Sequence, residues 1–181
     1  YVNNTLGTDD VSHGTGIDTD AWATLKYALT GSRVAKGDTV YLQAGTWSED
    51  QTNIALGAGT GEAVNIENYL SDSVTIQTGT TSQGLFFINN LEVVFDGVNF
   101  DNNNVAMSNK YLFGLYSAST GANVTVQNAE IDGTNSSGNI RIFKIYGTAP
   151  STLTINKANI HDSGIAIETA GTAGTNNTVN I

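Results

Sequence analysis

Residues 124–132 read Val-Thr-Val-Gln-Asn-Ala-Glu-Ile-Asp, and the same pattern occurs before and after this stretch, at residues 93–101 and 153–161. The three stretches align without gaps. In each one, mostly polar residues alternate with apolar ones, and the alternation shifts by one residue in a small step at Gly97, Asn128 or Lys157. The shared apolar positions are Val93/Val124/Leu153, Phe95/Val126/Ile155, Val98/Ala129/Ala158 and Phe100/Ile131/Ile160. A period of two is typical of strands with one buried face.

The spacing of these copies indicates the fold class. Equivalent apolar positions lie 31 and then 29 residues apart, and a repeat of this length built from short strands predicts a solenoid. A second set of apolar strands lies between the copies, at residues 85–88, 111–115, 140–145 and 165–167. Residues 74–76 and 179–181 are expected to be an earlier and a later copy of the first set. We predict an all-β chain that forms a right-handed parallel β-helix with two or three sheets.

The first fifty residues do not follow the repeat. Trp22, Leu25 and Leu29 fall on one face of a helix predicted over residues 20–29, and residues 39–44 read as a strand. We expect this short helix to cover the first coil, where an uncovered core and unpaired strand edges favour aggregation. Residues 1–50 are therefore expected to form an N-terminal cap, and residues 51–181 the coils of a β-helix that continues in a longer protein. The alternative is a subunit whose last strand edge stays open.

The cap residues carry a resemblance to a known family. The stretches Trp-Ala-Thr-Leu-Lys-Tyr-Ala-Leu at 22–29, Gly-Asp-Thr-Val-Tyr-Leu at 37–42 and Ala-Gly-Thr-Trp-Ser-Glu at 44–49 resemble the N-terminal entry of parallel β-helix proteins of the pectin-lyase-like superfamily. Residues 158–167 are similar to the coil consensus of these solenoids. The resemblance implies the fold and says little about activity, because the catalytic motifs of the hydrolase branch are missing from this sequence.

Composition narrows the possible partners and location. The chain has seven Lys and Arg residues and a formal net charge of −10, which argues against a nucleic-acid site. It has no cysteine, and no apolar run reaches the roughly 18 residues that a membrane helix requires. The polar surface is rich in Asn, Thr, Ser and Gly, which favours an extracellular protein, secreted or on the cell surface.

One column of polar residues is the candidate site. Asp101, Asp132 and His161 end the three repeated stretches, and Asp162 follows directly. If the coils are adjacent, these residues stack about 4.8 Å apart. Asp101 and Asp132 could then bind Ca²⁺, or act as a pair of carboxylates on a glycosidic bond. The alternative is that these residues only form turns where strands end.

Arg141 and Lys144 are the basic residues of the predicted strand at 140–145. In a polysaccharide lyase of the fold that this chain resembles, Arg or Lys abstracts a proton while Ca²⁺ neutralises the uronate, and such a base must lie beside the acidic column. Arg141, Lys144 and Asp132 are the catalytic candidates of that hypothesis. Positions at the surface explain both basic residues equally well.

Two functions follow from these patterns. The first is a secreted or cell-surface structural or adhesive module, whose partners are a polysaccharide, a cell-surface glycan or copies of itself. The second is the N-terminal part of a Ca²⁺-dependent lyase, or of a glycoside hydrolase, that acts on an acidic polysaccharide. The absence of the hydrolase motifs and the low basic content favour the first.

Overall fold

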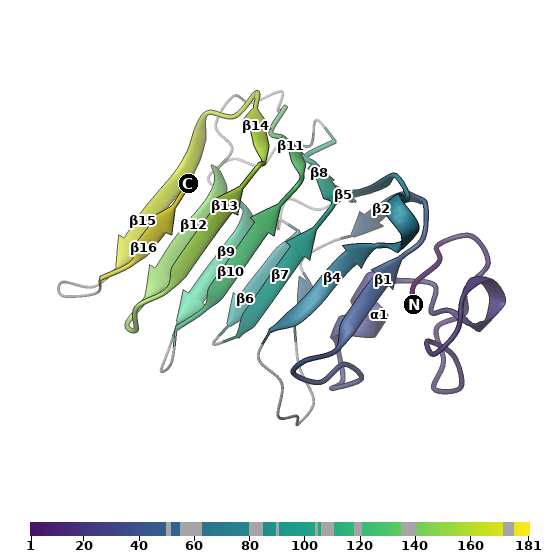
Figure 1. The fold of residues 1–181 in the computed structure, drawn as a ribbon. Coiled ribbons are helices and arrows are strands. Elements are labelled where there is room, and N and C mark those ends of the chain that lie inside the picture. The colour runs from purple at the N-terminus through teal and green to yellow at the C-terminus, as the bar shows by residue number, and fades with distance from the viewer. Residues whose placement is uncertain are drawn as a thin grey trace.

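The fold was analysed in a computed structural model, which describes residues 1–49, 52–54, 63–79, 85–89, 91–103, 105, 111–117, 121–134, 141–171 and 176–181. Strands recur in groups of three along this part of the chain, and each strand pairs in parallel with the equivalent strand of the next coil (Figure 1). The predicted all-β parallel β-helix with a short N-terminal helix is confirmed.

Three parallel sheets form the walls of the solenoid. The first sheet contains β1 (Thr39–Leu42), β4 (Val64–Asn68), β7 (Glu92–Asp96), β10 (Asn123–Gln127), β13 (Thr152–Asn156) and β16 (Thr178–Asn180). The second contains β2 (Gly45–Glu49), β5 (Val74–Thr78), β8 (Val98–Asp101), β11 (Glu130–Asp132) and β14 (Asn159–His161). The third contains β3 (Thr52–Asn53), β6 (Phe86–Asn89), β9 (Tyr111–Ser117), β12 (Arg141–Gly147) and β15 (Ile165–Gly171).

The register between coils is the one that the repeat predicts. Val126 pairs with Phe95 on one side and with Ile155 on the other, and all three side chains are buried. Residues 178–180 continue the first sheet as expected. Residues 74–76, in contrast, copy only the second half of the repeat, because β5 pairs with β8; the earlier copy of the first half is β4.

The small step in the repeat is a corner between the first and second sheets. Gly97, Asn128 and Lys157 occupy the same place in successive coils and have φ values of 69°, 51° and 51°. This left-handed conformation is easy for glycine and uncommon for other residues. Each repeated stretch is therefore two strands on two walls, and the period of two continues on both sides of the corner.

The N-terminal helix is shorter than predicted. A 3₁₀ turn spans Asp18–Asp20, and α1 runs only from Leu25 to Leu29, with Thr24 as its N-cap. The intervening backbone is held in an extended form, because Trp22 bridges to Val2 and the Asp9 carboxylate accepts hydrogen bonds from the backbone N–H groups of residues 23 and 24. A second 3₁₀ turn, Tyr69–Ser71, lies between β4 and β5.

The end of the first coil is covered by α1 together with the N-terminal segment. Leu25 and Leu29 of α1 are buried, and Val2 bridges to Leu42 of β1 as well as to Trp22. Because β1 and β2 already pair with β4 and β5, the stacked coils begin at residue 39. The expected contact of Trp22 with the core exists, although its side chain is only partly buried.

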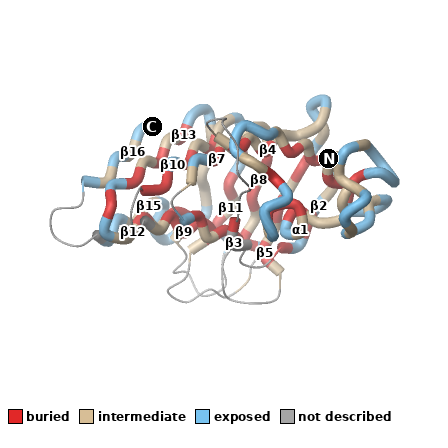
Figure 2. The backbone as a smooth tube through the Cα atoms, turned by 90° about the horizontal axis from the view of Figure 1, so that it is seen from below, coloured by how far each residue is buried: buried red, intermediate tan, exposed pale blue. Residues whose placement is uncertain are grey.

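The core is a continuous apolar column inside the three sheets (Figure 2). Five phenylalanines form its centre, and the ring centroid of Phe113 lies 4.8 Å from that of Phe100 and 4.9 Å from that of Phe143. The other two are Phe86 and Phe95. Within the described ranges, no helix has the length and apolar character needed to cross a membrane.

Candidate functional site

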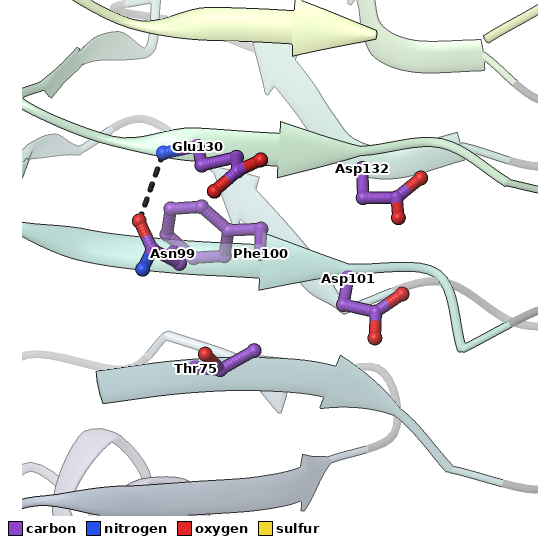
Figure 3. A pocket seen from close by; sticks show the side chains of 6 residues that line it. All are labelled: Thr75, Asn99, Phe100, Asp101, Glu130 and Asp132. Atoms are coloured by element: carbon purple, nitrogen blue, oxygen red, sulfur yellow. Dashed lines mark hydrogen bonds between the residues drawn. The ribbon is translucent and has the colours of Figure 1, made fainter. Parts of the chain in front are cut away.

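The structure brings the predicted polar column together at the ends of three adjacent strands. Asp132 of β11 pairs in register with Asp101 of β8 on one side and with His161 of β14 on the other. The carboxylates of Asp101 and Asp132 both point outward from the second sheet (Figure 3). Asp101, Asp132 and His161 therefore form one partly exposed row along the solenoid.

The two aspartates of the row also form turns. The Asp101 Oδ1 atom accepts a hydrogen bond of 2.6 Å from the Asn103 N–H. The Asp132 Oδ1 atom accepts bonds from the N–H and hydroxyl of Thr134, at 2.8 Å and 2.6 Å. Partial loss of solvent raises the pKa of the Asp132 carboxyl, but the bonds from Thr134 and the nearby His161 bring this pKa below its usual value. Both aspartates therefore take part in turns, and Oδ2 of each carboxylate lies outside these turn bonds.

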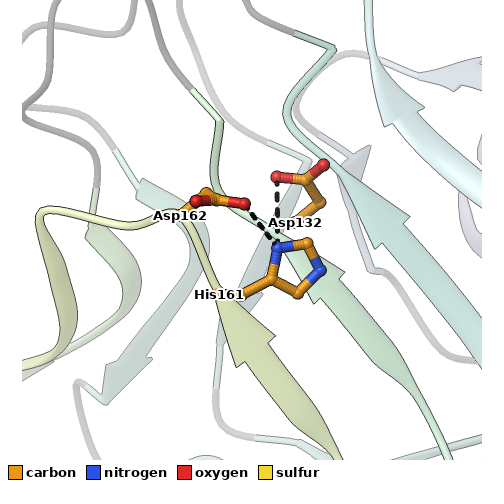
Figure 4. A group of neighbouring side chains, drawn as sticks. All are labelled: Asp132, His161 and Asp162. Carbon is orange, nitrogen blue, oxygen red and sulfur yellow. Dashed lines mark hydrogen bonds and ion pairs between the residues drawn. The ribbon is translucent and has the colours of Figure 1, made fainter.

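His161 lies at the centre of a cluster of carboxylates (Figure 4). Its Nδ1 atom is 2.8 Å from Oδ2 of Asp162 and 3.8 Å from Oδ1 of Asp132. Its Nε2 atom is 3.0 Å from Oε1 of Glu130, one coil away. Hydrogen bonds to Asp162 and Glu130 raise the pKa of the His161 imidazole, because they favour its cationic form. We call Glu130, Asp132, His161 and Asp162 the histidine cluster.

A shallow groove runs beside this cluster over the second sheet. It has a volume of about 210 Å³ and is lined by Thr75, Asn99, Phe100, Asp101, Glu130 and Asp132 (Figure 3). Asn99 fixes one wall, since its Oδ1 atom accepts a 2.9 Å hydrogen bond from the Glu130 N–H. Pockets for drug-sized ligands are about 300–1,000 Å³. The groove therefore suits an ion or a small polar group, and it is too small to enclose a sugar chain.

The predicted basic residues lie on a different sheet from the column. Arg141 and Lys144 belong to β12 of the third sheet, and Arg141 forms an ion pair with Glu168 of β15. The Lys144 ammonium lies 5.5 Å from the ring centroid of Tyr146 and 5.9 Å from that of Tyr111. Both basic side chains thus have partners within the third sheet.

The outer side of the third sheet carries an aromatic cluster that the sequence analysis missed. The ring centroid of Tyr146 lies 5.2 Å from Tyr116, 5.9 Å from Tyr111 and 6.2 Å from Phe87. All four side chains are partly exposed. We call them the aromatic face. The alternation could have revealed it, since Phe87 lies between the buried Phe86 and Ile88, and Tyr116 and Tyr146 follow the buried Leu115 and Ile145.

The aromatic face is held in place by local contacts. The ring of Tyr111 lies over Gly114, at the place that a side chain at 114 would occupy. The hydroxyls of Tyr111 and Tyr146 are joined by a 2.9 Å hydrogen bond. Burial, and then this bond, raise the pKa of the Tyr146 phenol, so it is neutral at physiological pH. The rings of Tyr111 and Tyr146 are therefore held together on this face.

No family model, curated protein or solved structure matches this chain.

Proposed function

We propose that the chain is a structural or adhesive β-helix module of a secreted or cell-surface protein, and that it binds a neutral glycan through the aromatic face. The observation that carries this proposal is the group of Phe87, Tyr111, Tyr116 and Tyr146 on the outer side of one rigid sheet, with neighbouring rings 5.2–6.2 Å apart.

The chemistry of this face suits sugars. A pyranose ring has an apolar face of C–H groups that packs on an aromatic ring, and its hydroxyls take hydrogen bonds at the edges. Tyrosine offers both an apolar body and a polar tip. Tyr116 and Phe87 stack on each other with an interplanar angle of 26° and a centroid distance of 5.8 Å, so the two rings are held nearly parallel.

Charge favours a neutral glycan over an acidic one. The formal net charge of the chain is −10, so its field repels a polyanion. Glu168 compensates the charge of Arg141 at the edge of the aromatic face. The ammonium of Lys144 lies over tyrosine rings, where it is attracted to their π-systems.

The structural and extracellular parts of the proposal rest on the sequence and the fold. A continuous stack of coils holds its outer faces rigidly, and the surface is rich in Asn, Thr, Ser and Gly. The resemblance of the cap residues to the pectin-lyase-like superfamily supports a glycan as the class of partner. It is not by itself an assignment of activity.

A lyase or hydrolase that acts on acidic polysaccharide is the second candidate. The observation in its favour is the row of Asp101 and Asp132 beside the groove. Against it, Arg141 is on another sheet and is paired with Glu168. The two candidates differ in their ligand: the enzyme requires a uronate polymer and forms unsaturated or shortened products, whereas the module binds neutral polymers and leaves them intact.

The decisive experiment is affinity electrophoresis of the protein through gels that contain one neutral or one acidic polysaccharide. We expect retardation by a neutral polymer, and a loss of affinity of about tenfold, or 1.4 kcal/mol, in Tyr116→Ala. Tyr41→Ala is the matched control, because Tyr41 is a partly exposed tyrosine of the first sheet that stacks on Tyr1 at 5.4 Å. Equal retardation of Tyr116→Ala and wild type would contradict the proposal. Cleavage of uronate polymers that is lost in Arg141→Ala would establish the enzyme instead.

A further inference from the structure

We propose that Asp132, His161 and Asp162 form a binding site for a divalent transition-metal ion such as Zn²⁺, with Glu130 as the residue that orients the imidazole. This site lies on the second sheet and is independent of the aromatic face on the third. It therefore goes beyond the proposed function, and either can fail without the other.

The donor atoms converge on one point. One ligand atom from each of Asp132, His161 and Asp162 lies within 4.8 Å of the other two. Zn–N and Zn–O bonds of about 2.0–2.1 Å place tetrahedral donors about 3.3 Å apart. The distances from His161 Nδ1, 2.8 Å to Asp162 and 3.8 Å to Asp132, lie on either side of that value. Small side-chain rotations would be enough to bring all three to a single ion.

The second ring nitrogen of His161 has the partner that a metal-bound histidine requires. Ligating histidines almost always donate the other ring N–H to a carboxylate or carbonyl, which fixes the tautomer and increases the basicity of the ligand. Here Nε2 is 3.0 Å from Glu130 Oε1. The Nδ1 atom faces Asp162 and Asp132 (Figure 4). A metal ion would take the place of the Nδ1 proton of the imidazolium, while Nε2 keeps its proton on Glu130.

The donor set selects the type of ion. Imidazole nitrogen suits Zn²⁺, Cu²⁺, Ni²⁺ and Fe²⁺, whereas Ca²⁺ takes six to eight oxygen ligands. The Ca²⁺ site predicted at Asp101 and Asp132 is thus a different hypothesis, with two carboxylates and no nitrogen donor. His161 is partly exposed and Asp162 is exposed, which gives the ion access and leaves room for water or a further ligand.

The ion would also connect two coils. Asp132 ends β11, whereas His161 ends β14 and Asp162 follows it. Binding by the folded state alone stabilises it by RT ln(1 + [L]/Kd). Zn²⁺ is therefore expected to raise the melting temperature of the protein as well as to bind.

Isothermal titration of the metal-free protein with ZnCl₂ at pH 7.5 tests the site. We expect one ion per chain, and a loss of affinity of at least about tenfold in His161→Gln and in Asp162→Asn. His13→Gln is the matched control: His13 Nδ1 lies 2.6 Å from Asp10, and that single carboxylate is the ion-pair partner it has among the described residues. This variant is expected to bind Zn²⁺ as the wild type does.

Two further measurements separate the site from a purely structural cluster. Glu130→Gln should weaken Zn²⁺ binding by about tenfold, while Glu92→Gln, at an exposed position of β7 in the first sheet, leaves it unchanged. In ¹⁵N NMR, Zn²⁺ should shift Nδ1 of His161 and leave the resonances of His13 in place. Equal affinity of wild type and His161→Gln, or the absence of binding in the wild type, would overturn the proposal. The cluster would then be an imidazolium ion held between carboxylates.

Discussion

The middle coils and the N-terminal cap satisfy the hydrogen bonds of their buried backbone groups in different ways. Around Phe113 the interior is apolar, because every strand pairs its N–H and C=O groups with the next coil. Where the cap meets the first coil, the buried Glu49 carboxylate of β2 accepts bonds from the Leu25 and Lys26 N–H groups at the start of α1. A repeating chain thus satisfies its backbone by stacking, whereas the first turn of a helix needs acceptors from elsewhere.

Phe113→Ala tests the apolar core of the coils, and it should give the largest loss of stability. The ring of Phe113 packs between Phe100 and Phe143 with no exposed area. Its removal leaves a cavity that the stacked coils on either side cannot close. We expect the free energy of unfolding in urea to fall by about 3–5 kcal/mol.

Phe87→Ala is the control for this loss. Phe87 is on the same sheet but on the outer side, where it is partly exposed, so we expect it to cost about 1 kcal/mol. Similar losses in the two variants would show that the outer aromatic face contributes as much to stability as the core does.

Asn102→Ala should have the next largest effect, because Asn102 is a polar exception within the coils. Its buried side chain follows β8, and its Nδ2 atom donates to the carbonyls of Val105 and Thr134, at 3.0 Å and 2.7 Å. The substitution leaves two carbonyls without this donor, and we expect it to cost about 2 kcal/mol in the same urea titration. Asn156→Ala, at an exposed position of β13, should change stability by less than about 0.5 kcal/mol. Equal effects would mean that the turn after β8 does not depend on Asn102.

Within the repeat, sequence reasoning gave the register between coils correctly. The alignment of Phe95, Val126 and Ile155 gave the register directly, because a slip by one residue would turn each apolar side chain outward. The same alignment gave the row of Asp101, Asp132 and His161. The apolar alternation and the register recur in every copy of the repeat, so an alignment of the copies reveals them.

The remainder depends on contacts that have no copies. The Glu49 carboxylate accepts hydrogen bonds from α1 at sequence separations of 23 and 24 residues. The Asp9 carboxylate accepts one from the N–H of Thr24 at a separation of 15 residues. These two carboxylates determine where the helix begins, and the prediction of a helix from residue 20 was therefore wrong. The corner residues Asn128 and Lys157 adopt positive φ values without being glycine, so the turn between sheets was read as a step within one strand.

Trp22→Ala tests how much the cap depends on apolar burial. Loss of a fully buried Trp side chain costs about 3–5 kcal/mol, but Trp22 is only partly buried. Its ring packs on Gly14, and its Nε1 atom donates to the Asp10 carbonyl at 3.0 Å. We expect a loss of about 1–2 kcal/mol in urea. Trp22→Phe should lose less, because it keeps most of the ring contact. A loss as large as that of Phe113→Ala would show that the cap is held by its apolar ring after all.

Glu49→Gln should change the free energy of unfolding least. It should raise this free energy at pH 7, whereas the other substitutions lower it. Burial raises the pKa of the Glu49 carboxyl, and the N–H groups of Lys26 and Leu25 offset this only in part. The folded state therefore holds the Glu49 proton more tightly than the unfolded chain, whose Glu pKa is about 4.3. The stability from this group is fully present below that unfolded pKa, and it is lost as the pH rises through the folded pKa. Glutamine keeps an oxygen acceptor for α1 and carries no charge, so the variant should be more stable than wild type at pH 7 and nearly equal to it at pH 3.

Urea titrations from pH 3 to pH 8 measure the difference, and Glu92→Gln, at an exposed position of β7, is the control for the loss of one carboxylate. A variant less stable than wild type at pH 7 would mean that attraction between the Glu49 charge and the helix N-terminus outweighs burial, and that the cap depends on a charge where the coils depend on none.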